Sequence, residues 1–208
     1  MKRVVLSALL LSIILCPDLF SQSKLATRNS FFDAESWLVF EDYAEALRIY
    51  QELQKKMPDN YNIKYRIGQC YLNIPGEKPK SISYLEEASK HINPKYREGN
   101  FNETGAPYDV LYYLANAYRI DNQLDKAIET YKSFRKNMDP KVYDSTLVDF
   151  QIQTCVNARE LMKVPVFIRE TNLGNDINDT KSEFNPVVSS KEDLLVFSRS
   201  EAFYDAIL

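Results

Sequence analysis

The chain has 208 residues, of which 45% are hydrophobic and 12% aromatic, and its formal net charge is −3 at pH 7. This is enough apolar material for one packed domain, or for one domain and a fragment of a second. The sequence has no basic stripe, which argues against a nucleic-acid-binding protein, and its five glycines are few for an all-β fold, so we predict a mainly α-helical protein.

The N-terminus has the pattern of an export signal. Lys2 and Arg3 precede a largely apolar run at residues 4–15, which is too short to cross a bilayer as a helix. We therefore expect residues 1–23 to be a signal peptide that is cleaved before Lys24. The mature protein is then expected to fold outside the cytoplasm, without a membrane span.

Two details of this signal stay open. Cleavage after Ser21 fits almost as well as cleavage before Lys24. Cys16 offers the alternative of a lipoprotein anchor, but such a signal has a small residue before the cysteine, and Leu15 is large.

Seven amphipathic helices are predicted after the signal. A proline follows the second, fourth and sixth helix, where the ring removes a backbone donor and clashes with the preceding turn. The predicted helices cover residues 27–40, 43–57, 61–73, 80–90, 107–120, 124–137 and 143–162.

The first six helices form three hairpins that repeat one pattern of apolar and small residues. In the third hairpin, Leu114, Ala115 and Tyr118 face Ala127 and Tyr131 across a short polar turn. The small residues let two helices approach closely, and such a hairpin needs neighbouring copies to bury its apolar face. The corresponding residues upstream are Ala34, Trp37, Tyr43, Ala46 and Tyr50, and then Ile67, Gly68, Tyr71, Ile82, Leu85 and Ala88.

Ala34 and Gly68 are 34 residues apart, which is the period of the tetratricopeptide repeat. The chain resembles that family over residues 27–163. The interval to the third hairpin is longer because of a proline-bearing turn at 73–79 and an insertion at 95–106. The resemblance implies an α–α superhelix of three helical hairpins.

The insertion is expected to be a solvated surface loop, since insertions of this size in compact arrays are usually functional or mobile. Its Tyr96 and Phe101 favour the alternative, in which the loop packs across the array or onto a partner. Both alternatives stay open.

The seventh helix is predicted to cap the array, because a lone helix at the end of a repeat array covers the last exposed edge of the core. The face expected to pack consists of Leu147, Phe150, Thr154, Ala158 and Leu161. Cys70 and Cys155 lie in helical segments and are expected to be buried, small apolar residues, although a disulfide between them stays open.

The pattern changes after Pro165. Short strands are predicted at 166–168 and 194–197, and the intervening residues resemble the start of a WD-repeat-like propeller blade, with Lys191-Glu192 where that blade has an Asp-Gly turn. The matching residues are Phe184, Pro186, Ser189, Leu195, Phe197 and Ser198. A blade needs four strands, so we expect residues 164–208 to be a linker and an incomplete first blade, with a further strand at 203–208.

We therefore expect residues 1–23 to be the signal, 24–163 the repeat domain and 164–208 the incomplete blade, all in an N-terminal part of a longer protein or in a truncated product. This order resembles a PorE-like family of envelope proteins, which continue into a propeller and an OmpA-like peptidoglycan-binding domain and are associated with type IX secretion. The matching strings are FFDAESW, CYLNIPGEKPKSISYLEEA, INPKYREGNFNETGAP and NLGNDIN with SEFNPVVS. The resemblance implies a periplasmic, outer-membrane-associated protein.

Catalytic and metal-binding motifs are absent from the sequence. His91 is the single histidine, and its place near a helix end favours an interaction with the helix dipole. A Cys/His metal site needs three or four ligands, and no phosphate-binding loop, nucleophile elbow or HExxH motif occurs. We predict neither a cofactor, nor a metal, nor enzyme activity.

The resemblance to tetratricopeptide repeats implies a concave groove lined by the first helix of each hairpin. Arginine, tyrosine and amide side chains can hold an extended peptide there, although an ordinary polar surface is the alternative. Counting from the repeated residues gives Arg28, Phe31, Glu35, Tyr65, Gln69, Asn73, Tyr112, Asn116 and Arg119.

The leading functional hypothesis is an exported, non-catalytic scaffold that docks envelope proteins or peptides. A second hypothesis makes the chain the N-terminal part of an OmpA-like protein that anchors to peptidoglycan through a region outside these 208 residues. A third makes it an accessory region of a propeller-containing hydrolase.

Overall fold

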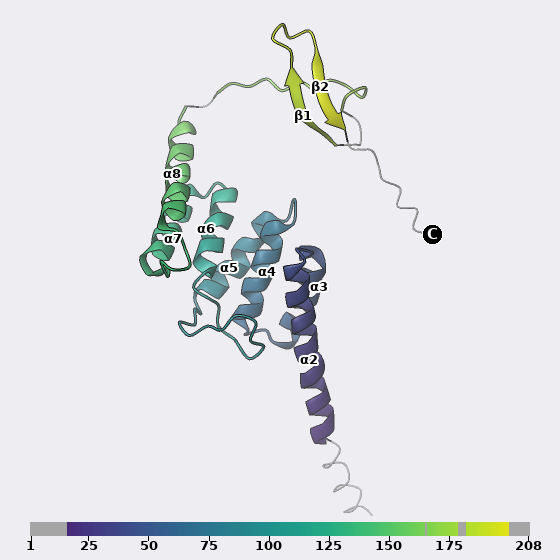
Figure 1. Cartoon of the computed structure of the whole chain (residues 1–208), viewed down its shortest axis with the longest axis vertical. Helices are drawn as coiled ribbons and strands as arrows, with labels where there is room; N and C mark the ends of the chain where they lie inside the picture. Colours follow the sequence, from purple (N-terminus) through teal and green to yellow (C-terminus); the bar gives the residue numbers. More distant parts are fainter. Residues whose placement is uncertain (1–15, 165, 179–181, 200–208) are drawn as a thin grey trace, which may run out of the picture. The chain divides into compact units, whose positions relative to one another are not determined.

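A computed structural model describes residues 16–164, 166–178 and 182–199 (Figure 1). The chain forms two compact units, Met1–Val164 and Pro165–Leu208, and each is described by itself. The apolar run of the expected signal and the expected strand at 203–208 lie outside the described residues.

The first unit is a row of helices, each packed against the next along the chain (Figure 1). It comprises the three expected hairpins, α2/α3, α4/α5 and α6/α7, followed by a single helix, so the predicted fold class is confirmed. The helices are α2 (Cys16–Val39), α3 (Tyr43–Lys56), α4 (Tyr61–Asn73), α5 (Ser81–Ser89), α6 (Val110–Ile120), α7 (Leu124–Asn137) and α8 (Ser145–Leu161).

The turns of the first and third hairpins share one backbone geometry. Glu41 and Asn122 both have positive φ, 60° and 56°, at the second position after the first helix of the hairpin. Asp42 N then donates to Trp37 O at 3.0 Å, and Gln123 N donates to Tyr118 O at 2.8 Å. These bonds satisfy carbonyls that the end of a helix leaves free, and they reverse the chain within a few residues.

The turn of the second hairpin is longer, as its two prolines predict. It contains the 3-10 helix η1 (Lys78–Lys80), and Gly76 takes the positive φ of 77°. The N-terminal end of α4, before this hairpin, is capped by Asn60, whose side-chain oxygen accepts a hydrogen bond from Ile63 N at 3.0 Å.

Small residues bring the helices of each hairpin into close contact. Ala34, Ala46, Ala115 and Ala127 are all fully buried in the core. At Gly68, an added Cβ would lie 2.5 Å from Leu85 Cγ, so α4 and α5 approach each other so closely that a larger residue would have to displace Leu85.

Cys70 and Cys155 are buried, unpaired thiols in two different core clusters.

Helix α8 closes the end of the core, but its packed face only partly agrees with the predicted one: Ala158 packs against the core and Thr154 is half-buried. Val148 and Cys155 are buried, and Ile152 and Val156 pack beside them, whereas Leu147 is 62% exposed. Phe150 and Leu161 are exposed as well, so these three parts of the prediction are wrong. Apolar residues occur on more than one side of α8, and the spacing alone does not decide which side meets α7.

Helix α2 begins at Cys16, earlier than the predicted start at residue 27, and it continues through the expected cleavage site. Its hydrogen bonds include one from Thr27 Oγ1 to Ser23 O at 2.8 Å. The boundary of the signal remains a prediction.

The second unit contains one antiparallel hairpin of β1 (Glu183–Val188) and β2 (Leu195–Arg199). Glu192, with φ 58°, takes the turn position for which glycine is usual, and Ser189 Oγ accepts hydrogen bonds from the backbone of Asp193 and Leu194. Residues 166–168, which were expected to form a strand, are not paired with any described residue, and an unpaired extended run is not stable as a strand.

Candidate protein-binding face

The first helices of neighbouring hairpins contact one another on one side of the row. Arg66 on α4 reaches Glu35 on α2, with 2.8 Å between Nη2 and Oε2. Tyr65 on α4 packs edge-to-face on Tyr113 of α6, with 5.7 Å between ring centroids. We call the surface formed by α2, α4 and α6 the inner face.

The chain between α5 and α6, residues 90–109, lies against this face and is called the α5–α6 loop. Its two ends are joined by a parallel bridge between Ile92 and Ala106. The loop is also tied to the start of α4, because Tyr61 N donates to Thr104 O at 2.8 Å and Asn60 Nδ2 donates to Glu103 O at 3.2 Å.

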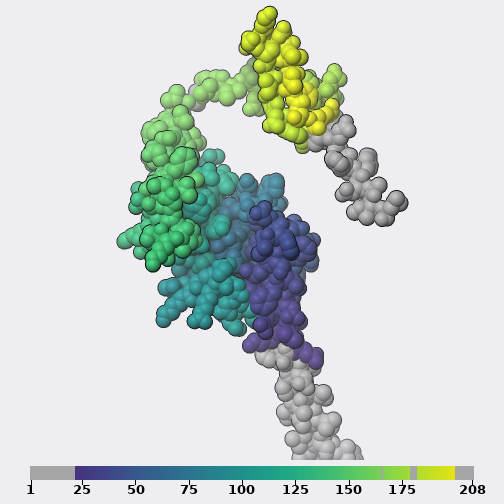
Figure 2. Space-filling view, viewed as in Figure 1, coloured from purple at the N-terminus to yellow at the C-terminus, as the bar shows by residue number. Residues whose placement is uncertain are grey.

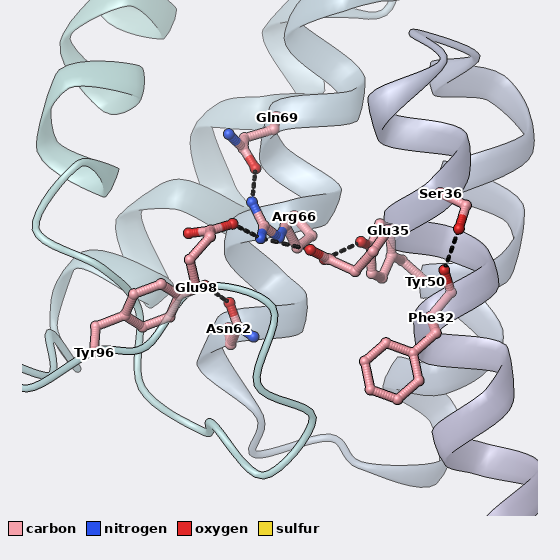
Figure 3. Close-up of polar contacts among 9 residues, drawn as sticks. All are labelled: Phe32, Glu35, Ser36, Tyr50, Asn62, Arg66, Gln69, Tyr96 and Glu98. Atoms are coloured by element: carbon pink, nitrogen blue, oxygen red, sulfur yellow. Dashed lines mark hydrogen bonds and ion pairs between the residues drawn. The ribbon is translucent and has the colours of Figure 1, made fainter.

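Two aromatic residues fix the outer part of the loop on the array. The Tyr96 hydroxyl donates to Asn62 Oδ1 at 2.9 Å (Figure 3). The rings of Phe101 and Phe31 pack edge-to-face, with 5.8 Å between their centroids. Of the two alternatives for the insertion, the packed one is therefore the one that the structure shows.

Arg66 is the centre of a polar network between α2, α4 and the loop, as Figure 3 shows. It is 5% exposed, pairs with both Glu35 and Glu98, and donates to Gln69 Oε1 at 3.0 Å. Tyr50 donates its hydroxyl proton to the other oxygen of Glu35. Burial opposes the charged form of Arg66, but the nearby carboxylates outweigh it and hold the pKa of Arg66 above its usual value.

The candidate groove residues on α2 and α4 are mostly occupied within the protein. Phe31 and Tyr65 are each 2% exposed and belong to the core, so their side chains do not line an accessible groove. Glu35 and Gln69 bind Arg66. The helical spacing places all four on the correct side of their helices, but the α5–α6 loop and the neighbouring helix cover them.

The candidates near the C-terminal ends of α4 and α6 are more accessible. Asn73 is exposed, and its amide donates to Gln69 O at 2.9 Å. Asn116 is half-buried and accepts a hydrogen bond from the Tyr131 hydroxyl at 2.5 Å. Arg119 is half-buried beside Tyr131, and its Nε has no hydrogen-bond partner among the described residues.

Tyr112 and Tyr131 give this part of the inner face a rigid aromatic base. The centroids of their rings are 5.8 Å apart, and the Tyr112 ring also packs on that of Phe134, with 5.4 Å between centroids. Burial raises the pKa of the Tyr131 hydroxyl to about 12, although the charge of Arg119 acts in the opposite direction. Tyr131 therefore stays neutral and keeps its hydrogen bond to Asn116 at physiological pH.

Arg28, the remaining candidate, lines a cleft at the other end of the inner face. The cleft has a volume of about 480 Å³ and lies between α2 and the loop. Figure 2 shows the surface of the loop, in teal, beside that of α2, in purple. Its lining residues are Lys24, Leu25, Arg28, Phe32, Gly99, Asn100, Phe101 and Asn102.

The sequence predictions missed Arg66 and Glu98. Arg66 stands between Tyr65 and Ile67, but the helix also contains Asn62, Lys64 and Gln69, so its sequence does not set Arg66 apart as a buried charge. The partner on the loop has no regular spacing from Arg66, so only the path of the loop in space identifies Glu98.

None of the helices in the described ranges is both long and apolar enough to span a membrane. Over those same residues, the His, Cys, Asp and Glu side chains form no group of three that could hold a metal ion.

Comparison with known proteins gives a family match for part of the helical unit. Residues 109–141, which include α6 and α7, match the tetratricopeptide repeat family. None of the curated proteins matches the chain significantly.

Two solved structures have a similar arrangement of helices. The tetratricopeptide-repeat domain of Sgt2 from Aspergillus fumigatus has a TM-score of 0.50 and 14% identity, covering 72% of this chain and 89% of that domain. The TPR2B domain of yeast Sti1 in its complex with pHsp70 has a TM-score of 0.49 and 15% identity, covering 64% of this chain and 98% of that one. Residues 109–141 therefore match the tetratricopeptide repeat, and the helical unit has a fold similar to that of a tetratricopeptide-repeat domain.

Proposed function

We propose that this protein is a scaffold that binds other proteins through the open part of its inner face. Tetratricopeptide-repeat arrays are typically non-catalytic interaction modules, and the fold of the helical unit is that of such an array. The observation that carries the proposal is the set of accessible polar side chains in the C-terminal halves of α4 and α6, Asn73, Asn116 and Arg119, of which Asn116 is bound by Tyr131.

The chemistry of this surface suits an extended peptide. The amides of Asn73 and Asn116 can bind the peptide backbone, and the guanidinium of Arg119 can bind a carbonyl or a carboxylate. Tyr131 holds the amide of Asn116, and Gln69 O holds that of Asn73, so little entropy of these two side chains is lost when a partner binds.

The proposal extends to the place of action, the periplasm, and to partners that are envelope proteins or peptides. Its support is the pattern of Lys2, Arg3 and the apolar run at 4–15, together with the resemblance of the sequence strings given above to the PorE-like family. On this proposal the protein acts in a secretion, gliding or wall-associated complex at the outer membrane.

Export is tested by fractionating cells that produce the full chain and sequencing the N-terminus of the recovered protein. We expect the protein in the periplasmic or outer-membrane fraction, beginning at Lys24 or at Gln22. Recovery in the cytoplasm of protein that still contains residues 1–15 would contradict export but would leave the binding surface untouched.

Binding is tested by placing a photo-crosslinking amino acid at Asn73 or at Ile120, the last residues of α4 and α6. We expect both positions to capture the same protein in cells. The matched control is Glu129, which is exposed on α7, the second helix of its hairpin. Equal capture at Glu129, or no capture at either inner position, would refute binding through the inner face.

A further inference from the structure

A cleft lies between residues 23–32, in the middle of α2, and the outer part of the α5–α6 loop. It consists of the space of about 480 Å³ beside Arg28 and an adjoining space of about 400 Å³, which share Lys24, Phe101 and Asn102 as lining residues. The second space extends to Lys56 and Met57 at the end of α3. We call the two together the α2–loop cleft.

The charge of this cleft differs from that of the whole chain. Its lining includes Lys24, Arg28 and Lys56, and no carboxylate side chain lines either of the two spaces. None of these three cations makes an ion pair with another described residue, although the protein as a whole has a net charge of −3. Three unpaired cations around one recess attract an anionic group.

The floor of the cleft is apolar and is held in place. Phe101 is packed on Phe31, and the Arg28 guanidinium lies 5.4 Å from the centroid of the Phe32 ring. Leu25 is exposed at the rim. The bonds between Thr104 and the start of α4 fix the adjacent part of the loop, so the recess does not need to form when a ligand arrives.

The rim also presents a hydrogen-bonding group. The side-chain amide of Asn102 has no hydrogen-bond partner among the described residues, and it lines both spaces. An amide beside an apolar floor can bind the backbone of a peptide whose side chain enters the recess.

We propose that the α2–loop cleft binds an acidic peptide segment that carries an aromatic or large aliphatic side chain. The apolar side chain lies against Phe32 and Phe101, and the flanking carboxylates pair with Lys24, Arg28 and Lys56. A membrane surface fits less well, because the aromatic floor is recessed between a helix and a loop rather than protruding from a convex surface.

This inference rests on the proposed function in that the ligand is a protein segment. It concerns a different surface, however, since the residues proposed for the inner face lie near the C-terminal ends of α4 and α6.

The test measures binding of a fluorescent octapeptide of alternating glutamate and phenylalanine to the purified full chain, by anisotropy at about 50 mM salt, where screening is weak. The cleft variant combines Lys24→Gln, Arg28→Gln and Lys56→Gln. The control combines Lys90→Gln, Lys136→Gln and Lys141→Gln, which removes the same charge from exposed positions outside the cleft. We expect binding to weaken by at least about tenfold in the cleft variant and by less than about twofold in the control.

A second peptide, with serine in place of each phenylalanine, tests the apolar floor. We expect it to bind at least about tenfold more weakly than the first peptide. Equal binding of the two peptides, equal weakening in the cleft and control variants, or binding to phosphatidylglycerol vesicles without binding to the first peptide would each overturn the proposal.

The same measurement separates the two proposals. Arg119→Gln on the inner face should leave the affinity for the octapeptide unchanged if the cleft is an independent site. If the crosslinks at Asn73 and Ile120 fail while the cleft variant loses peptide binding, the inner-face proposal is refuted and the cleft proposal is supported. If the crosslinks succeed while the cleft variant binds the peptide as the wild type does, only the cleft proposal is refuted.

Discussion

Arg66 Nη2 lies 2.8 Å from Glu35 Oε2, and this ion pair joins the first two hairpins across the inner face. Arg66 is 5% exposed, so its charge depends on a partner within the protein. Glu98 is its second partner, but the Glu98 side chain is 68% exposed. The two carboxylates are therefore expected to contribute very different free energies of folding.

We predict that Glu35→Ala lowers the free energy of unfolding by about 3 to 5 kcal/mol, because a buried charge loses its main partner. Tyr50 loses the acceptor of its hydroxyl in the same variant. Glu98→Ala, the matched control, should cost about 1 kcal/mol or less, since solvent screens the exposed pair. Urea denaturation followed by circular dichroism measures both, and equal losses would show that the Arg66–Glu35 pair is not the dominant one.

The contact between Gly68 and Leu85 gives a second prediction. A Cβ at position 68 would overlap Leu85, so Gly68→Ala should lower the free energy of unfolding by about 1 to 3 kcal/mol, despite the higher helix propensity of alanine. In Leu85→Ala the obstructing atoms are gone, and adding Gly68→Ala to it should cost less than adding it to the wild type. Strict additivity of the two substitutions in thermal or urea unfolding would argue against this close approach of α4 and α5.

A third prediction concerns the face of α8 that packs. Val148→Ser should lower the free energy of unfolding by about 2 kcal/mol, because it places a hydroxyl in the core that Val148 shares with α7. Leu147→Ser should change it by no more than about 0.5 kcal/mol, since Leu147 is exposed. A larger loss in the Leu147 variant would restore the packing face expected from the spacing of Leu147, Phe150 and Leu161.

A fourth prediction uses the pH dependence of stability. Burial raises the pKa of the Cys70 thiol to about 12, from 9.0. The folded protein then keeps a proton that the unfolded chain releases near pH 9, so the stability due to this group is present below pH 9 and is lost as pH rises towards about 12.

We expect the free energy of unfolding of the wild type to fall between about pH 9 and pH 10, by at most about 1.4 kcal/mol per pH unit for this one group. Cys70→Ala should lose less over the same interval, which lies below the usual pKa of the tyrosines. Urea denaturation at several pH values measures the difference, and identical pH profiles would show that Cys70 is not protected in the folded state.

The helices and their pairing were predictable because they depend on local periodicity. The hairpin turns, the small residues at Ala34, Gly68 and Ala115, and the number of hairpins all follow from one repeated pattern. The strand at 166–168 was predicted wrongly, since local β-propensity does not supply a pairing partner.

The candidate site was predictable only in part. The spacing places Phe31 and Tyr65 on the side of the helix that faces the groove, but their burial depends on what covers them. The α5–α6 loop covers Phe31 through Phe101, and α6 covers Tyr65 through Tyr113. A loop without periodicity gives no sequence signal for its path, so the Arg66–Glu98 pair and the α2–loop cleft became visible only in three dimensions.

The bridge between Ile92 and Ala106 sets the two ends of the α5–α6 loop side by side. Because those ends are already joined, the chain between them can gain, lose or exchange residues without altering the span from α5 to α6. Binding specificity can therefore diverge in this segment during evolution while the helical framework stays the same, and the segment offers a natural position for grafting a foreign recognition sequence.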